Sequence, residues 1–190
     1  KNVDIMANYE IVALYKDHES EVSAHAVAIS EMYHLTLRFE KVPEMETAIN
    51  SLLNQNTVLC VIHRSVFKFR KLLKYVYAIT KPVIVVHPND SPEVYNRLKV
   101  PVGYLQENKE KVVWANFFQR NNENSRVELI VPKEKDEDIA FMVKNNVDFI
   151  ENIFKKSGAQ YTKVFVEGSF EKNLKKVFLE SDDCVIFIMR

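Results

Sequence analysis

The sequence predicts an α/β protein built on open parallel sheets with helices on both faces. The clearest evidence lies in residues 57–88, where two short apolar runs, residues 58–62 and 83–86, are rich in β-branched side chains. Between these runs, apolar residues recur at three- and four-residue steps from Phe69 to Ile79, as on one face of a helix. A strand, helix, strand unit of this kind joins parallel strands, and the same alternation recurs along the chain.

The composition is that of a packed globular protein. The 190 residues are 47% hydrophobic, which is enough for one large core or two small ones. Lys plus Arg and Asp plus Glu number 26 each, so the chain lacks the basic field of a nucleic-acid-binding protein. No apolar run approaches the roughly 20 residues that span a bilayer, and the first ten residues lack a signal-peptide core. We expect a cytoplasmic protein with no membrane span and no nucleic-acid partner.

Strands and helices alternate through the first half. Four strands are predicted, at residues 9–15, 35–42, 58–62 and 83–86. Three helices are predicted between them, at residues 21–34, 45–53 and 69–79. Asp17 or Ser20 can cap the first helix, and Ser65 can cap the third. The expected order is βαβαβαβ.

The pattern starts again after a polar stretch that contains Pro92, so we predict one domain over residues 1–90, a linker over 91–99 and a second domain over 100–190. Strands are predicted at residues 100–105, 126–131, 161–167 and 184–189. Helices are predicted at residues 109–119, 137–156 and 170–178. Gly158 suits the left-handed turn that ends a helix.

The two halves can be laid over each other. TVLCVIHR, which ends at Arg64, matches DCVIFIMR, which ends at Arg190, in pattern and in the closing Arg. The first half continues from there into a helix and a strand. We therefore expect further residues beyond Arg190, or a strand from elsewhere beside this one, because an open edge in mid-sheet is an aggregation hazard.

Three stretches carry a resemblance to a known family: VPVGYLQENKEKVVWANFFQR, VFVEGSFEKNLKKVFLESDDCVIFIMR and KPVIVVHP. In the order and pattern of these segments the chain resembles the universal stress protein family, in a tandem form with two repeats. The resemblance implies a Rossmann-like, adenine nucleotide alpha hydrolase-like fold. It also implies a cytoplasmic stress-response or regulatory protein that is not an enzyme and acts by dimerisation and partner binding.

The departures from the family are equally informative. Members that bind ATP carry Gly-x2-Gly-x9-Gly-Ser/Thr after the fourth strand, whereas residues 63–82 contain no glycine. No cofactor is therefore expected. The acid that usually follows the first strand has a counterpart in Asp17, but the second half offers Asn108. The first half also lacks one strand and helix, so it resembles a degenerate domain.

One candidate site follows from the carboxyl edge of the first sheet. His63, Arg64 and Ser65 end a strand and begin a helix, where a phosphate can rest on helix amides and a guanidinium. With Asp17 they form an alternative hypothesis, a nucleotide (ATP or AMP) site without a glycine loop. The other interpretation is structural: Ser65 caps the helix, Arg64 is solvated and His63 is a polar strand end.

A second candidate is a dimer edge. In the family the last strand often pairs domains, and its counterpart here is the apolar run of Val83, Ile84, Val85 and Val86. We expect a homodimer or an internal pseudo-dimer through this strand, with an unknown protein partner. A further alternative is that the chain is a cytoplasmic regulatory domain of a membrane transporter.

Other chemistry has weaker support. The basic run from Arg64 to Lys74, with Tyr75 among its interleaved aromatics, is predicted to be the solvated face of a helix rather than a surface for nucleic acid or an anionic membrane. The five His residues lack zinc-site spacing, so no metal is expected. Cys60, inside an apolar run, is predicted to be buried and inert.

Overall fold

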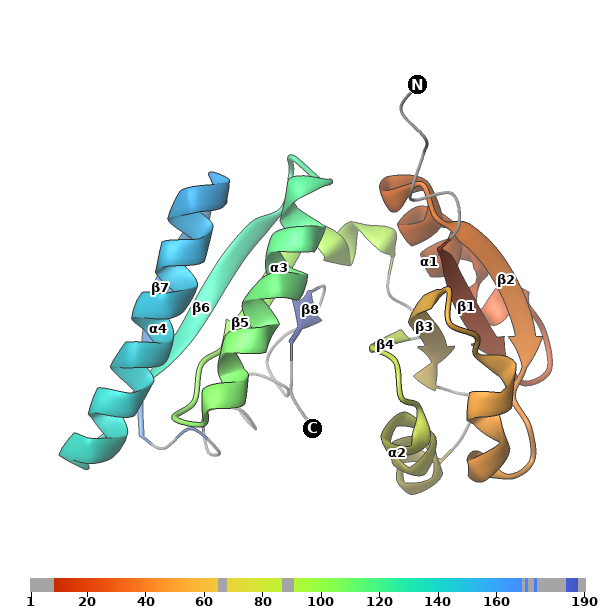
Figure 1. Cartoon of the computed structure of the whole chain (residues 1–190), viewed down its shortest axis with the longest axis horizontal. Helices are drawn as coiled ribbons and strands as arrows, with labels where there is room; N and C mark the ends of the chain where they lie inside the picture. Colours follow the sequence, from red (N-terminus) through yellow and green to blue (C-terminus); the bar gives the residue numbers. More distant parts are fainter. Residues whose placement is uncertain are drawn as a thin grey trace. The chain divides into compact units, whose positions relative to one another are not determined.

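The computed structural model describes residues 9–64, 68–86, 91–168, 170, 173 and 184–187. The chain forms two compact units, Lys1–Pro92 and Glu93–Arg190. Each unit has a four-stranded parallel sheet with helices against it, which confirms the predicted α/β class (Figure 1).

Unit 1 has the predicted order of strands and helices. Its elements are β1 (Glu10–Tyr15), α1 (Ser20–Tyr33), β2 (Thr36–Lys41), η2 (Glu46–Leu52), β3 (Thr57–His63), α2 (Phe69–Ala78) and β4 (Val83–Val86). The strands lie in the order β2-β1-β3-β4. The α-helix expected from Met45 is wrong in type, because η2 is a 3-10 helix that begins without a side-chain cap. Its Asn50 side chain is instead bonded to Ala78 and Thr80, which ties η2 to the end of α2.

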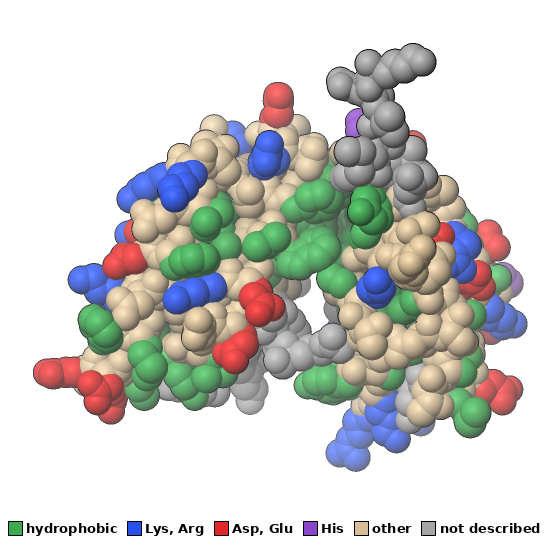
Figure 2. Space-filling view, viewed as in Figure 1, with side chains coloured by type: hydrophobic (Ala, Val, Ile, Leu, Met, Phe, Trp, Pro, Cys, Tyr) green, Lys and Arg blue, Asp and Glu red, His purple; other side chains and the backbone are tan. Residues whose placement is uncertain are grey.

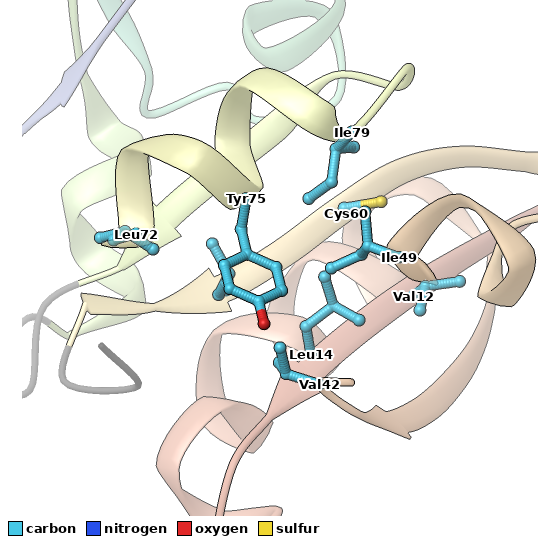
Figure 3. Packing of buried hydrophobic residues seen from close by; sticks show 9 residues of the cluster. Val12, Leu14, Val42, Ile49, Cys60, Leu72, Tyr75 and Ile79 are labelled. Carbon is cyan, nitrogen blue, oxygen red and sulfur yellow. The ribbon is translucent and has the colours of Figure 1, made fainter. Parts of the chain in front are cut away.

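One hydrophobic cluster of unit 1 lies on the face of the sheet that η2 and α2 cover. Residues from β1, β3, η2 and α2 pack there, and Tyr75 points from α2 toward Leu14 and Val42 (Figure 3). Tyr75 is fully buried, and its hydroxyl donates to the carbonyl oxygens of Pro43 at 2.5 Å and Glu44 at 2.9 Å. Tyr75, one of the aromatic residues interleaved with the basic run, is therefore a core residue and not an exposed stacking group.

Unit 2 begins earlier than the sequence predicted. Its first elements are η4 (Pro92–Asn96) and β5 (Arg97–Pro101), so most of the predicted linker, residues 91–99, belongs to the unit. The polar composition of that stretch is overridden by burial of Val94, Tyr95 and Leu98. The Tyr95 ring stacks on Phe118 with centroids 5.7 Å apart. The strand predicted at residues 100–105 is correspondingly shifted toward the amino terminus.

The remaining elements of unit 2 follow the prediction more closely. They are η5 (Gln106–Glu110), α3 (Lys111–Arg120), β6 (Arg126–Lys133), α4 (Glu137–Ser157), β7 (Tyr161–Glu167) and β8 (Val185–Ile186). Asp136 caps α4 by accepting from the Ile139 amide at 3.0 Å, and Gly158 ends it at φ 74°. Most of the predicted helix at residues 170–178 lies outside the described residues, as do residues 188–189 of the predicted last strand.

The strand orders explain how the two halves correspond. The sheet of unit 2 has the order β7-β6-β5-β8. In each unit the first strand lies between the second strand and the strand that carries the matched segment, β3 in unit 1 and β8 in unit 2. Among the described residues, unit 1 has an extra strand beyond β3, and unit 2 has an extra strand beyond β6. The two sheets are thus similar in their centres and different at their edges.

Candidate functional site

The carboxyl edge of unit 1 brings the predicted anion-site residues into one region. The strand order reverses between β1 and β3, which is where open α/β sheets bind ligands. Leu14 on β1 is level with Ile62 on β3, so the two strands end side by side. Asp17 lies in the turn after β1, and His63 and Arg64 lie at the end of β3.

The described residues of this group differ in their exposure. Asp17 is exposed, with its carboxylate 3.9 Å from the Lys16 ammonium, and Arg64 is also exposed. His63 is only 5% exposed and lies level with Val86 in the sheet. Ser65 lies outside the described residues, and the N-cap position of α2 is Lys68, whose side chain makes no capping hydrogen bond. The edge offers surface charges without the glycine turn that lets a phosphate approach the backbone.

The basic face of α2 is solvated, as predicted. Lys68, Arg70, Lys71 and Lys74 are exposed, while Leu72 is buried on the opposite side of the helix.

The carboxyl edge of unit 2 contains a buried lysine. Lys111, the first residue of α3, is 3% exposed, and its ammonium donates to the Pro101 carbonyl oxygen at 2.7 Å and to Asn108 Oδ1 at 2.8 Å. Its nitrogen also lies 5.5 Å from the centre of the Phe170 ring. Burial lowers the pKa of Lys111 to about 8. No carboxylate forms an ion pair with it among the described residues.

Two buried asparagines complete this cluster. Asn108 Oδ1 accepts from the Gly103 amide at 3.1 Å, and Asn146 of α4 donates to the carbonyl oxygens of Gly103 at 2.8 Å and Leu105 at 2.9 Å. A Cβ at Gly103 would lie 3.3 Å from both Asn108 and Phe170, so the packing there is close. The loop after β5 is thus held by the unit's own side chains.

Sequence reasoning singled out Asn108 but missed Lys111 and Asn146. A helical projection carried the signal, since Lys111 lies four residues before Ala115 and seven before Phe118, both of which are buried. A lysine on the apolar face of a helix requires a hydrogen-bonding partner in the core.

The described residues outside these two edges include one fully buried thiol and no metal-binding cluster. Cys60 is fully buried, and burial raises the pKa of its thiol to about 12, which agrees with the predicted inert role. No group of three or more His, Cys, Asp or Glu side chains in the described part of the chain could hold a metal ion. Within the same residues, no helix is both long enough and apolar enough to cross a membrane.

A shallow apolar groove lies between α3 and α4. It is lined by Val112, Val113, Phe149 and Ile153, with Lys109 and Glu110 at its rim. Hydrophobic side chains are visible over these two helices (Figure 2). Small-molecule sites combine an enclosed apolar pocket with convergent polar groups, and this open groove has a Lys109 ammonium 5.3 Å from the Phe149 ring centre as its main polar feature.

The dimer edge predicted at Val83–Val86 is an edge strand. β4 is the last strand of its sheet and pairs only with β3 among the described residues. The Cys60 amide donates to the Pro82 carbonyl oxygen at 2.9 Å. Because successive residues of a strand face opposite sides, the backbone groups of Val83 and Val85 point to the open edge. The Val85 side chain is 39% exposed.

Comparisons with known proteins show no family for this chain. No protein-family model and no curated protein matches it. A ligand-free crystal structure of aspartate transcarbamoylase from Trypanosoma cruzi is similar over 97% of this chain and 71% of that one, at 8% identity and a TM-score of 0.36. A likeness this distant carries no argument about function.

Proposed function

We propose that this protein is a universal-stress-protein-like regulatory protein that acts by association rather than catalysis, and that β4 pairs with β4 of a second copy. The observation that carries the proposal is the open, apolar edge of β4. An exposed strand edge is a template for pairing with another chain unless the sequence protects it.

The two edges of the unit 1 sheet differ in this protection. β2, at one edge, carries Arg38, Glu40 and Lys41, and charged side chains are a common device against edge pairing. β4, at the other edge, carries four apolar residues and no charge. The difference favours β4 as the edge that is used.

The backbone direction defines the register of this pairing. Val83 and Val85 present their N–H and C=O groups outward, so in an antiparallel pair Val83 lies opposite Val85 of the second copy, with Ile84 at the two-fold axis. Both outward residues then exchange hydrogen bonds, and their β-branched side chains pack across the strands.

Sedimentation velocity over a concentration series tests the proposal. The monomer mass is 22.2 kDa, and we expect concentration-dependent species of at least twice that mass. Val85→Lys should weaken the pairing because it places an ammonium against Val83 of the second copy. Val27→Lys is the matched control, since Val27 on α1 has the same 39% exposure. A wild-type chain that is monomeric at all concentrations would rule out the homodimer.

A nucleotide-binding function is the second candidate, favoured by the exposed Asp17 and Arg64 beside the point where the strand order reverses. Calorimetric titration with ATP and AMP tests it. Binding that is lost in Arg64→Ala would support a phosphate site there, and absence of heat with both nucleotides would remove this candidate.

A further inference from the structure

The outer strand of unit 2 is also an open edge. β7 is the last strand on its side of the sheet and pairs with β6 among the described residues. It is seven residues long, and the Phe165 side chain is 57% exposed. A long edge strand with exposed apolar side chains either pairs with another chain or is an aggregation hazard.

The backbone of β7 has a defined polarity at this edge. The Val127 amide on β6 donates to the Gln160 carbonyl oxygen at 3.2 Å, and Val127 is level with Tyr161. The backbone N–H and C=O groups of the even-numbered residues of β7 therefore point toward β6. Lys163, Phe165 and Glu167 direct their N–H and C=O groups outward, where they can bond to a further strand.

In the segment Lys163-Val164-Phe165-Val166-Glu167, a valine lies on each side of Phe165 and opposite charges lie at the two ends. In an antiparallel pair of two such strands centred on Phe165, each residue meets its mirror position. Lys163 lies opposite Glu167 of the second copy, Val164 lies opposite Val166, and the two Phe165 rings meet at the axis.

The symmetry satisfies the backbone as well as the side chains. Lys163, Phe165 and Glu167 carry the charged and aromatic side chains, and they also point their backbone groups outward. In this register all three therefore form hydrogen-bonded pairs with the second copy. A shift by one residue would set outward groups against inward ones. Opposite charges directly across a strand pair stabilise it, and like charges destabilise it.

We propose that β7 forms a two-fold antiparallel pair with β7 of a second copy, in the register that sets Lys163 opposite Glu167. The occupant is a second copy of this chain because the charge pattern complements itself. This interface is separate from the one proposed for β4, so a chain that uses both edges assembles beyond a dimer.

Both charges already have partners within the unit. The Lys163 ammonium lies 3.0 Å from Glu151, and the Glu167 carboxylate lies 2.5 Å from the Lys133 ammonium. The alternative role of these residues is to protect the edge from pairing. The two roles predict different results when the charges of Lys163 and Glu167 are reversed. If the charges only protect the edge, reversing them does not make one variant bind preferentially to the other.

A charge-reversal cycle tests the pairing in the full chain carrying Val85→Lys, which is expected to weaken pairing through β4. Glu167→Lys sets lysine against lysine twice in the homodimer, and Lys163→Glu sets glutamate against glutamate twice. We expect each to raise the dissociation constant of the β7 dimer by about tenfold. The double variant Lys163→Glu/Glu167→Lys restores opposite charges at both positions and should recover association.

Mixing the two single variants gives the decisive measurement. In a heterodimer of Glu167→Lys with Lys163→Glu, every opposed pair has opposite charges, so the equimolar mixture should form dimers at concentrations where each variant is monomeric. Thr162→Lys is a control for added charge, since Thr162 lies opposite Gly168 in this register. Native mass spectrometry of chains with different isotope labels reports the heterodimer directly.

The outcomes separate this proposal from the proposed function. If the wild type and the Val85→Lys chain form assemblies of the same size, the proposed β4 pairing is contradicted, while the charge-reversal cycle on β7 can still be interpreted. If the mixture stays monomeric, or if charge reversal leaves the mass of the Val85→Lys chain unchanged, the β7 pairing is overturned.

Discussion

The Arg38 guanidinium on β2 donates two hydrogen bonds to the Glu10 carboxylate on β1, from Nη2 to Oε1 at 2.7 Å and from Nε to Oε2 at 3.1 Å. Glu10 also accepts from the Thr57 hydroxyl on β3 at 2.7 Å. This network joins three strands through one carboxylate. The hydrogen bonds from Arg38 are the main cause of the lowered pKa of Glu10.

Glu10→Gln should destabilise unit 1 by about 1–3 kcal/mol at neutral pH, because hydrogen bonds to a charged group are lost. The folded pKa of Glu10 is below its ordinary value of 4.5, so the carboxylate stabilises the fold above pH 4.5 and this contribution is lost as pH falls through the folded pKa. Urea unfolding at several pH values should show the gap between variant and wild type closing in acid. Glu31→Gln, at an exposed position on α1, is the control.

Lys111→Met should destabilise unit 2 by about 1–3 kcal/mol, because the Pro101 carbonyl and the Asn108 Oδ1 lose their donor. The folded pKa of about 8 lies below the ordinary 10.5, so the unfolded chain binds more protons between these values. The free energy of unfolding contributed by Lys111 therefore rises with pH across that window.

Chemical unfolding at pH 7, 9 and 10.5 measures this rise. It should be present in the wild type and in Lys135→Met, which removes an exposed lysine, and absent from Lys111→Met. A rise of equal size in Lys111→Met would assign the effect to other groups.

Tyr75→Phe should cost about 1–2 kcal/mol, since the hydroxyl that bonds the Pro43 and Glu44 carbonyl oxygens is removed while the ring stays in the core. Tyr15→Phe, in the same unit, removes a hydroxyl without a hydrogen bond to a described residue. Thermal unfolding of both should show a loss for Tyr75→Phe alone, and equal losses would contradict the anchoring role.

Asp136→Ala should destabilise α4 by about 1 kcal/mol, because the Ile139 amide loses the acceptor that caps it. Asp136→Asn keeps an oxygen at the same place and should retain most of the stability. Denaturant titration distinguishes the two, and an equal loss in both variants would point to charge rather than capping.

The family resemblance, the stress-response role and the cytoplasmic location remain predictions from sequence. The edge position of β4 and the meeting of strand ends near Asp17 and Arg64 come from the sheet order. Periodicity identifies a strand without naming its neighbours, so the sequence alone left both placements open.

Local patterns by themselves determined the α/β class, the bounds of β7 and nearly the whole of α4. The α4 signals in the sequence are contiguous, a regular apolar stripe followed by Gly158, and the structure adds the Asp136 cap. Only the tertiary structure decided the start of β5, the burial of Tyr75 and the hydrogen-bond partners of Lys111. The partners come from other segments of the fold: Phe118 stacks on Tyr95, the Pro43 and Glu44 carbonyl oxygens lie beside the Tyr75 hydroxyl, and the Pro101 carbonyl oxygen accepts from Lys111. These contacts make burial of the polar groups favourable.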